Sequence, residues 1–161
     1  MDHEDRLAQL WASIDDRDED DFLAAMAELV SALPADDPVG PFEQASAFDS
    51  TGYPDRAVPL YRRALELGLV GLRRRRAVIQ LASSLRNLGR ADESVALLTA
   101  ELDAGSAEVS ELDDAVRAFL ALALTDVGRE REAVSVALTA LAPHLTRYNR
   151  SLDAYARLLV E

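Results

Sequence analysis

The amino-acid sequence predicts an all-α protein, a solenoid of antiparallel helix pairs, and three observations predict it. The 161 residues are 49% hydrophobic but only 6% aromatic, so the core must come mostly from Leu, Ala and Val, a mixture that favours helix. Apolar residues recur at helical spacing along most of the chain. Gly52, Gly89 and Gly128 each follow one such stretch and precede another, as glycines do where one helix ends and the next begins.

The N-terminal third predicts two helices and then a break. Apolar residues at helical spacing over 7–14 and again over 22–33 are separated by the acidic run DDRDEDD at 15–21. These acids favour the start of the second helix, because negative charge is stabilised at a helix N-terminus. The segment PADDPVGP at 34–41 ends it, since proline cannot continue a helix, and a third helix is expected at about 41–51.

The three glycines align a repeat of two helices. A small residue lies seven positions before each glycine and another lies five positions after it. Small residues at these places let the two helices of a pair approach closely. The residues before the glycines are Ala45, Ala82 and Ala121, and those after them are Ala57, Ser94 and Ala133.

This pattern resembles the tetratricopeptide repeat family, with its best match in FEQASAFDSTGYPDRAVPLYRRALELG. The large aromatic residue near the start of the family's first helix is missing, and Pro41, Val78 and Arg117 stand in its place. The resemblance implies a right-handed superhelix of about four helix pairs plus a C-terminal capping helix. We expect a single domain over 1–161, with a divergent N-terminal pair at 1–36, three repeat units at 41–143 and the capping helix at 146–161. The sequence leaves open whether the first pair is a degenerate repeat.

Charge and composition exclude several classes of function. The 29 acidic and 17 basic residues give a net charge of −12, which repels nucleic acids and anionic membranes. The absence of cysteine excludes disulfides and thiolate chemistry. The acidic start MDHEDRLAQLW is unlike a signal peptide, and no apolar run is long enough to span a membrane. We therefore expect a soluble cytoplasmic protein.

The residue patterns predict no catalytic, metal or cofactor site. An EF-hand loop starting at Asp16 would have Asp21 where glycine is needed and Ala27 where a bidentate glutamate is needed. The two histidines, His3 and His144, are far apart in the sequence. Ser83 and Ser84 lie within a predicted helix that has no histidine to activate them. The sequence therefore predicts that the protein is not an enzyme.

The family resemblance implies a protein-interaction module whose first helices line a concave groove. The groove would carry apolar residues and a basic spot at Arg76 and Arg86, where arginine beside Asn87 could hold a partner's carboxylate. The run Arg73–Arg76 at a helix N-terminus needs compensation, either from acidic neighbours such as Asp49 or from an acidic partner. The predicted partner-binding residues are Phe42, Ser46, Asp49, Arg76, Ile79, Ser83, Arg86, Asn87, Leu122, Thr125 and Asp126. The expected partner is a protein or peptide.

An alternative interpretation is a structural homodimer that self-associates through apolar residues of its terminal helices. The candidate contact residues are Trp11, Tyr148, Leu152 and Tyr155.

Overall fold

The computed structural model describes residues 2–105 and 110–161. Within these residues the chain forms nine α-helices and three short 3-10 turns, which confirms the all-α prediction. The α-helices are α1 (His3–Ala12), α2 (Glu19–Ser31), α3 (Val39–Ser50), α4 (Pro54–Glu66), α5 (Gly71–Asn87), α6 (Ala91–Ala104), α7 (Asp113–Asp126), α8 (Glu130–Leu141) and α9 (Asn149–Leu158). The 3-10 turns are η1 (Ile14–Asp16), η2 (Ser110–Leu112) and η3 (Ala142–His144).

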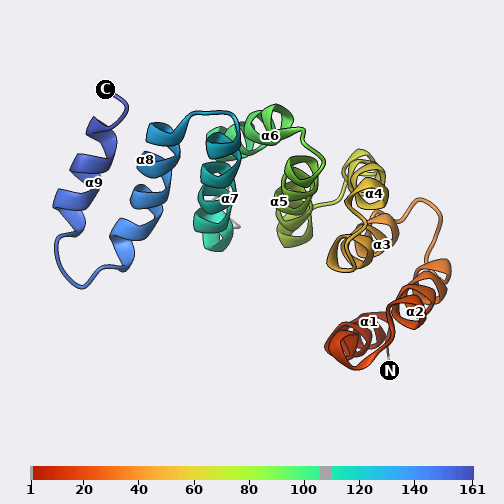
Figure 1. The fold of residues 1–161 in the computed structure, drawn as a ribbon. Coiled ribbons are helices and arrows are strands. Elements are labelled where there is room, and N and C mark those ends of the chain that lie inside the picture. The colour runs from red at the N-terminus through yellow and green to blue at the C-terminus, as the bar shows by residue number, and fades with distance from the viewer. Residues whose placement is uncertain (1, 106–109) are drawn as a thin grey trace. The chain divides into compact units, whose positions relative to one another are not determined.

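The helices pack sequentially in adjacent pairs, as the repeat predicts. The contacts between α3 and α4 and between α7 and α8 are the most extensive, and α9 packs against α8 (Figure 1). The contacts within the chain divide it into two compact units, Met1–Ser84 and Leu85–Glu161, with the boundary inside α5. The single-domain organisation expected from the sequence stays a prediction.

The three repeat glycines end their helices in the way that the sequence predicts. Gly52, Gly89 and Gly128 have φ angles of 87°, 76° and 74°. After Gly52, the amide of Tyr53 donates a hydrogen bond to the carbonyl of Phe48, five residues back in α3, at 2.8 Å. Equivalent bonds of 2.9 Å follow Gly89 and Gly128, so the three turns share one geometry. This left-handed cap satisfies the last carbonyls of each first helix and starts the second helix at once.

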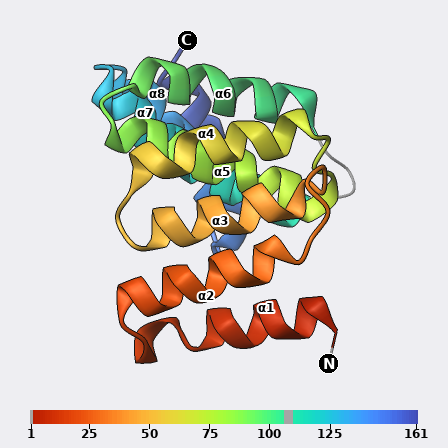
Figure 2. The same cartoon turned by 90° about the vertical axis from the view of Figure 1, so that its right-hand side faces the viewer.

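The N-terminal helices α1 and α2 lie side by side (Figure 2) and pack around an apolar cluster. Asp18 is the N-cap of α2 and accepts a hydrogen bond from the amide of Asp20, so the acidic run does begin a helix. The ring of Trp11 packs edge-on against Phe22, with 5.3 Å between the ring centroids. The buried members of the cluster are Leu7, Leu10, Phe22, Met26, Leu29 and Ala47, of which Ala47 comes from α3.

The small residues aligned on the repeat glycines are all buried. Small side chains between paired helices let the two helices approach closely, because a larger side chain would hold the two backbones apart. The buried residues are Ala45, Ala57, Ala82, Ser94, Ala121 and Ala133.

Candidate functional site

Two predicted groove residues of α3 lie in the core of the first unit. The side chains of Phe42 and Ser46 are buried, and the Phe42 ring lies 6.4 Å from the ring of Tyr61 in α4. On the other side, the guanidinium of Arg76 in α5 lies 5.4 Å from the centre of the Phe42 ring. Because α4 and α5 cover this face of α3, Phe42 and Ser46 do not line an open surface. The expectation that they contact a partner is corrected accordingly.

Asp49, the third predicted residue of α3, belongs to a polar cluster with Tyr61 and Ser84. The Ser84 hydroxyl donates a hydrogen bond to Oδ1 of Asp49 at 2.8 Å, and the Tyr61 hydroxyl donates to Oδ2 at 3.4 Å. Burial raises the pKa of the Asp49 carboxyl, and these two hydrogen bonds lower it in part. Burial also raises the pKa of the Tyr61 hydroxyl, which therefore stays protonated and acts as a donor. The cluster joins α3, α4 and α5 through one carboxylate.

Arg73, the first arginine of the run in α5, is compensated by acidic residues of the chain itself. The guanidinium of Arg73 pairs with Glu4 of α1 and lies 3.5 Å from Oε1 of Glu43. Arg75 is buried, whereas the side chain of Arg76 is exposed beyond its contact with Phe42. The acids that contact Arg73 are therefore Glu4 and Glu43, whereas Asp49 accepts hydrogen bonds from Ser84 and Tyr61.

The remaining predicted residues of α5 have different surroundings. Ile79 is buried, Ser83 is half-buried and Asn87 is exposed. Arg86, at the end of the helix, is half-buried and its Nε lies 2.5 Å from Oδ2 of Asp126 at the end of α7. Two predicted residues from different repeats are thus brought together within the second unit.

Leu122 and Thr125, two of the three predicted residues of α7, line an apolar pocket of about 420 Å³. The side chains of Leu122 and Val134, one from each helix, are each 47% exposed. Thr125 contributes the one hydroxyl, which donates to the carbonyl of Ala121 at 3.0 Å. The pocket is lined by Ala118, Ala121, Leu122 and Thr125 of α7 and by Ala133, Val134 and Ala137 of α8. We call it the α7–α8 pocket.

Sequence reasoning missed the contribution of α8 to this pocket. Lining residues were predicted only on the first helix of each pair, and α8 is the second helix of its pair. A signal was present, because Val134 directly follows Ala133, one of the aligned small residues, and therefore lies near the surface where the two helices meet. The exposed methyl groups of the pocket suit it to hold an apolar side chain.

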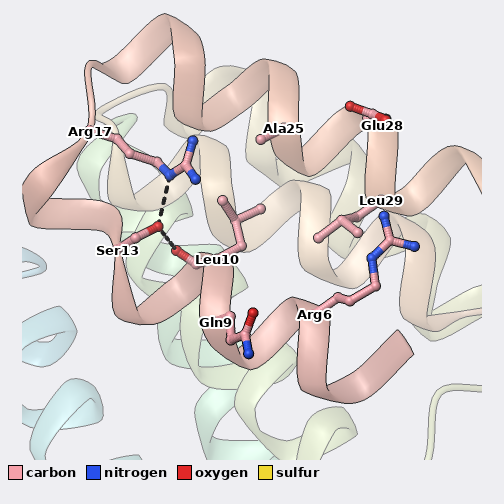
Figure 3. A pocket seen from close by; sticks show the side chains of 8 residues that line it. All are labelled: Arg6, Gln9, Leu10, Ser13, Arg17, Ala25, Glu28 and Leu29. Atoms are coloured by element: carbon pink, nitrogen blue, oxygen red, sulfur yellow. Dashed lines mark hydrogen bonds between the residues drawn. The ribbon is translucent and has the colours of Figure 1, made fainter. Parts of the chain in front are cut away.

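Another pocket, of about 350 Å³, lies between α1 and α2 and was also missed by the sequence reasoning (Figure 3). Its apolar part is formed by Leu10, Ala25 and Leu29, and Arg6 and Arg17 lie toward opposite ends. The Arg17 guanidinium donates to Ser13 Oγ at 2.8 Å, and the Ser13 hydroxyl donates to the carbonyl of Leu10 at 2.8 Å. These bonds fix Arg17 beside the turn between the two helices. Gln9 and Glu28 complete the lining.

Within residues 2–105 and 110–161, no three or more His, Asp or Glu side chains are placed together as a metal site. No described helix is both long and apolar enough to cross a membrane. The two histidines remain far apart in the chain, and His144 lies 2.8 Å from Asp114 of α7, whose pKa is lowered by this contact and by Arg117.

Comparison with known proteins gives one match. The family model described as Tetratrico peptide repeat matches residues 38–159, which is more than half of the chain. The match includes α9 and begins after α2, so it leaves the N-terminal pair outside. No curated protein and no solved structure is significantly similar to the chain.

Proposed function

Since the chain belongs to the tetratricopeptide repeat family, whose members generally act in protein–protein interactions and are typically non-catalytic, we propose that it binds a partner protein through the α7–α8 pocket. The observation that carries this proposal is the exposure of Leu122 and Val134 side by side in an apolar depression. Exposed apolar patches of this kind mark interaction sites more often than ordinary surface.

The chemistry of the pocket indicates the kind of partner segment. An aliphatic or aromatic side chain of the partner would fill the space between α7 and α8, where it would displace water from methyl groups. The Arg86 and Asp126 pair borders the same end of α7 as Thr125 and offers one charge of each sign to the partner backbone or side chains. The net charge of −12 favours approach of a basic segment.

The test is a quantitative capture experiment with the full chain. Wild-type protein and a Leu122→Glu/Val134→Glu variant are immobilised and exposed to lysate of the source cell, and retained proteins are quantified by mass spectrometry. A Val70→Glu variant is the matched control, because Val70 is an aliphatic residue that is 77% exposed and lies outside the pocket. Circular dichroism establishes that all three remain helical.

If the partner binds at the α7–α8 pocket, at least one protein should be retained by the wild type and by the Val70→Glu control but not by the Leu122→Glu/Val134→Glu variant. Identical retained proteins for all three would refute binding at this pocket. A partner identified in this way is then purified, and its affinity is compared between the same three proteins.

A second candidate function is structural self-association, and the exposure of α9 favours it. Tyr148 and Tyr155 are 75% and 67% exposed, and Leu152 is half-buried. Trp11, the fourth residue suggested for this role, is engaged within the first unit by Phe22 and Glu43. The C-terminal helix therefore supports this candidate better than the N-terminal one does.

A further inference from the structure

The outward face of α9 carries large apolar side chains. Ala156 is buried where α9 packs against α8, whereas Tyr148, Tyr155 and Leu158 are exposed. Spacings of four and three residues place Ser151, Tyr155 and Leu158 on one side of the helix, and Tyr148 precedes them as its N-cap residue. We call these four residues the α9 face. Among the described residues, α9 makes its main contacts with α8, beside which it lies in Figure 1, and with η3, and the side chains of all four residues of the α9 face are exposed.

Tyr148 is exposed and has a strained backbone conformation. Tyr148 has a φ of 70°, the only positive value for a non-glycine residue among those described, and this conformation costs about 1–2 kcal/mol for an L-residue. The turn is held by Asn149, whose side-chain amide donates to the carbonyls of Ala142 and Leu145 at 2.8 Å and 2.6 Å. Strain that the surroundings maintain at an exposed aromatic residue points to a role for that residue.

We propose that the α9 face binds the same face of a second copy of this chain, with the two α9 helices antiparallel about a two-fold axis. This inference rests on the second candidate function and specifies its geometry. Ser151 and Tyr155 lie equally far from Asp153 along the chain, and so do Tyr148 and Leu158. In an antiparallel pair, Tyr155 of each copy therefore meets the small Ser151 of the other, and Tyr148 meets Leu158. The contact of Tyr155 with Ser151 packs a large side chain against a small one, which lets two helices approach closely.

Charge favours the antiparallel orientation over the parallel one. Arg147 precedes the α9 face and Glu161 follows it, and both side chains are exposed. Antiparallel packing brings Arg147 of each copy near Glu161 of the other, so the contact occurs twice by symmetry. Parallel packing would bring like charges together at both ends and would align the two helix dipoles unfavourably.

The test uses the full chain and measures its mass by light scattering after size exclusion, from about 1 to about 100 μM, where weak homodimers associate. The wild type is expected to dimerise. Arg147→Glu and Glu161→Arg are each expected to weaken the dimer at least about tenfold, because each places two pairs of like charges in contact. An equimolar mixture of the two variants is expected to restore dimers, because every such contact then pairs opposite charges. Native mass spectrometry identifies these as mixed dimers.

Arg150→Glu is the matched control, because it makes the same charge change on the same helix away from the α9 face, and it is expected to leave the dimer intact. Tyr155→Glu, with its helical content checked by circular dichroism, is expected to give monomers. A wild type that stays monomeric at the highest concentration overturns both this inference and the second candidate function. A dimer that the two charge variants do not weaken overturns the antiparallel α9 pairing alone, and neither result bears on the α7–α8 pocket.

Discussion

Glu43 accepts a hydrogen bond of 2.7 Å from the indole Nε1 of Trp11, although 32 residues separate them in the sequence. The Glu43 side chain is buried, and its other oxygen lies 3.5 Å from Nε of Arg73. One carboxylate thus links α1, α3 and α5. A buried carboxylate is tolerated only when donors surround it, so this contact ties the N-terminal pair to the repeat that follows it.

Replacing Trp11 with phenylalanine should therefore destabilise the fold. The Trp11→Phe variant keeps an aromatic ring beside Phe22 but leaves one oxygen of Glu43 without its donor, at an expected cost of about 1–3 kcal/mol in the free energy of unfolding. Urea unfolding measures the loss. In a double-mutant cycle with Glu43→Gln, the two substitutions should be clearly non-additive; additive effects would mean that the hydrogen bond contributes nothing.

The raised pKa of Asp49 predicts that the free energy of unfolding depends on pH. Because burial raises the pKa of Asp49 in the folded state above its usual value of 3.8, the folded chain holds this proton more tightly than the unfolded chain does. The contribution of Asp49 to stability is therefore most favourable below its unfolded pKa and falls as the pH rises through the folded pKa. At neutral pH the ionised form of this half-buried carboxyl is therefore less favourable to the fold than the protonated form would be.

Two substitutions test this. Asp49→Asn keeps an oxygen that can accept from Ser84 and removes the charge, so at pH 7 it should leave stability unchanged or raise it, and it should remove this part of the pH dependence. Asp49→Ala leaves the hydroxyls of Ser84 and Tyr61 without an acceptor and should cost about 1–3 kcal/mol. Urea unfolding at several pH values between 4 and neutrality, about one unit apart, gives both results. An Asp49→Asn variant as unstable as Asp49→Ala would show that the charge itself is needed.

The sequence predicted the helix pairs because their signals are local. A glycine at a left-handed cap and small residues seven before and five after it depend only on neighbours along the chain, and Gly52, Ala45 and Ala57 behave as expected. The burial of Phe42 and Ser46 could not be read in this way, because it depends on which helix covers α3. Helical periodicity shows that a face is apolar, but not which neighbour covers it.

The charged and aromatic contacts were predicted least well for the same reason. Arg73 finds Glu4 and Glu43 from helices that precede it by 69 and 30 positions, and no spacing rule along one helix would select them. Tyr148 falls where a helix was expected to be starting, yet it takes a left-handed conformation because Asn149 fixes the turn beside it. Of the predicted site, the structure pairs Arg86 with Asp126 and places Leu122 and Thr125 in the lining of the α7–α8 pocket.

Replacing Gly52 should lower the free energy of unfolding because of the backbone conformation at this position. A Cβ atom at this position would meet nothing within 4 Å, so the φ of 87° is the sole obstacle to a larger residue. Gly52→Ala should therefore lower the free energy of unfolding by about 1 kcal/mol. Gly52→Asn should cost less, since asparagine tolerates left-handed backbone better than alanine does. Thermal unfolding of the two variants compares them, and equal losses would indicate a steric cause instead.

The Arg86 and Asp126 pair should matter more for binding than for stability. Their side chains are 30% and 37% exposed, and exposed ion pairs contribute only about 0–1 kcal/mol to folding. Asp126→Ala should therefore change the urea midpoint little, while it should weaken binding of the partner identified with the α7–α8 pocket. Exchanging the two residues, as Arg86→Asp/Asp126→Arg, keeps the pair but reverses its direction. If the partner uses these charges, the exchanged variant should fold normally and still bind poorly, and full binding by the exchanged variant would show that only the neighbouring apolar surface is recognised.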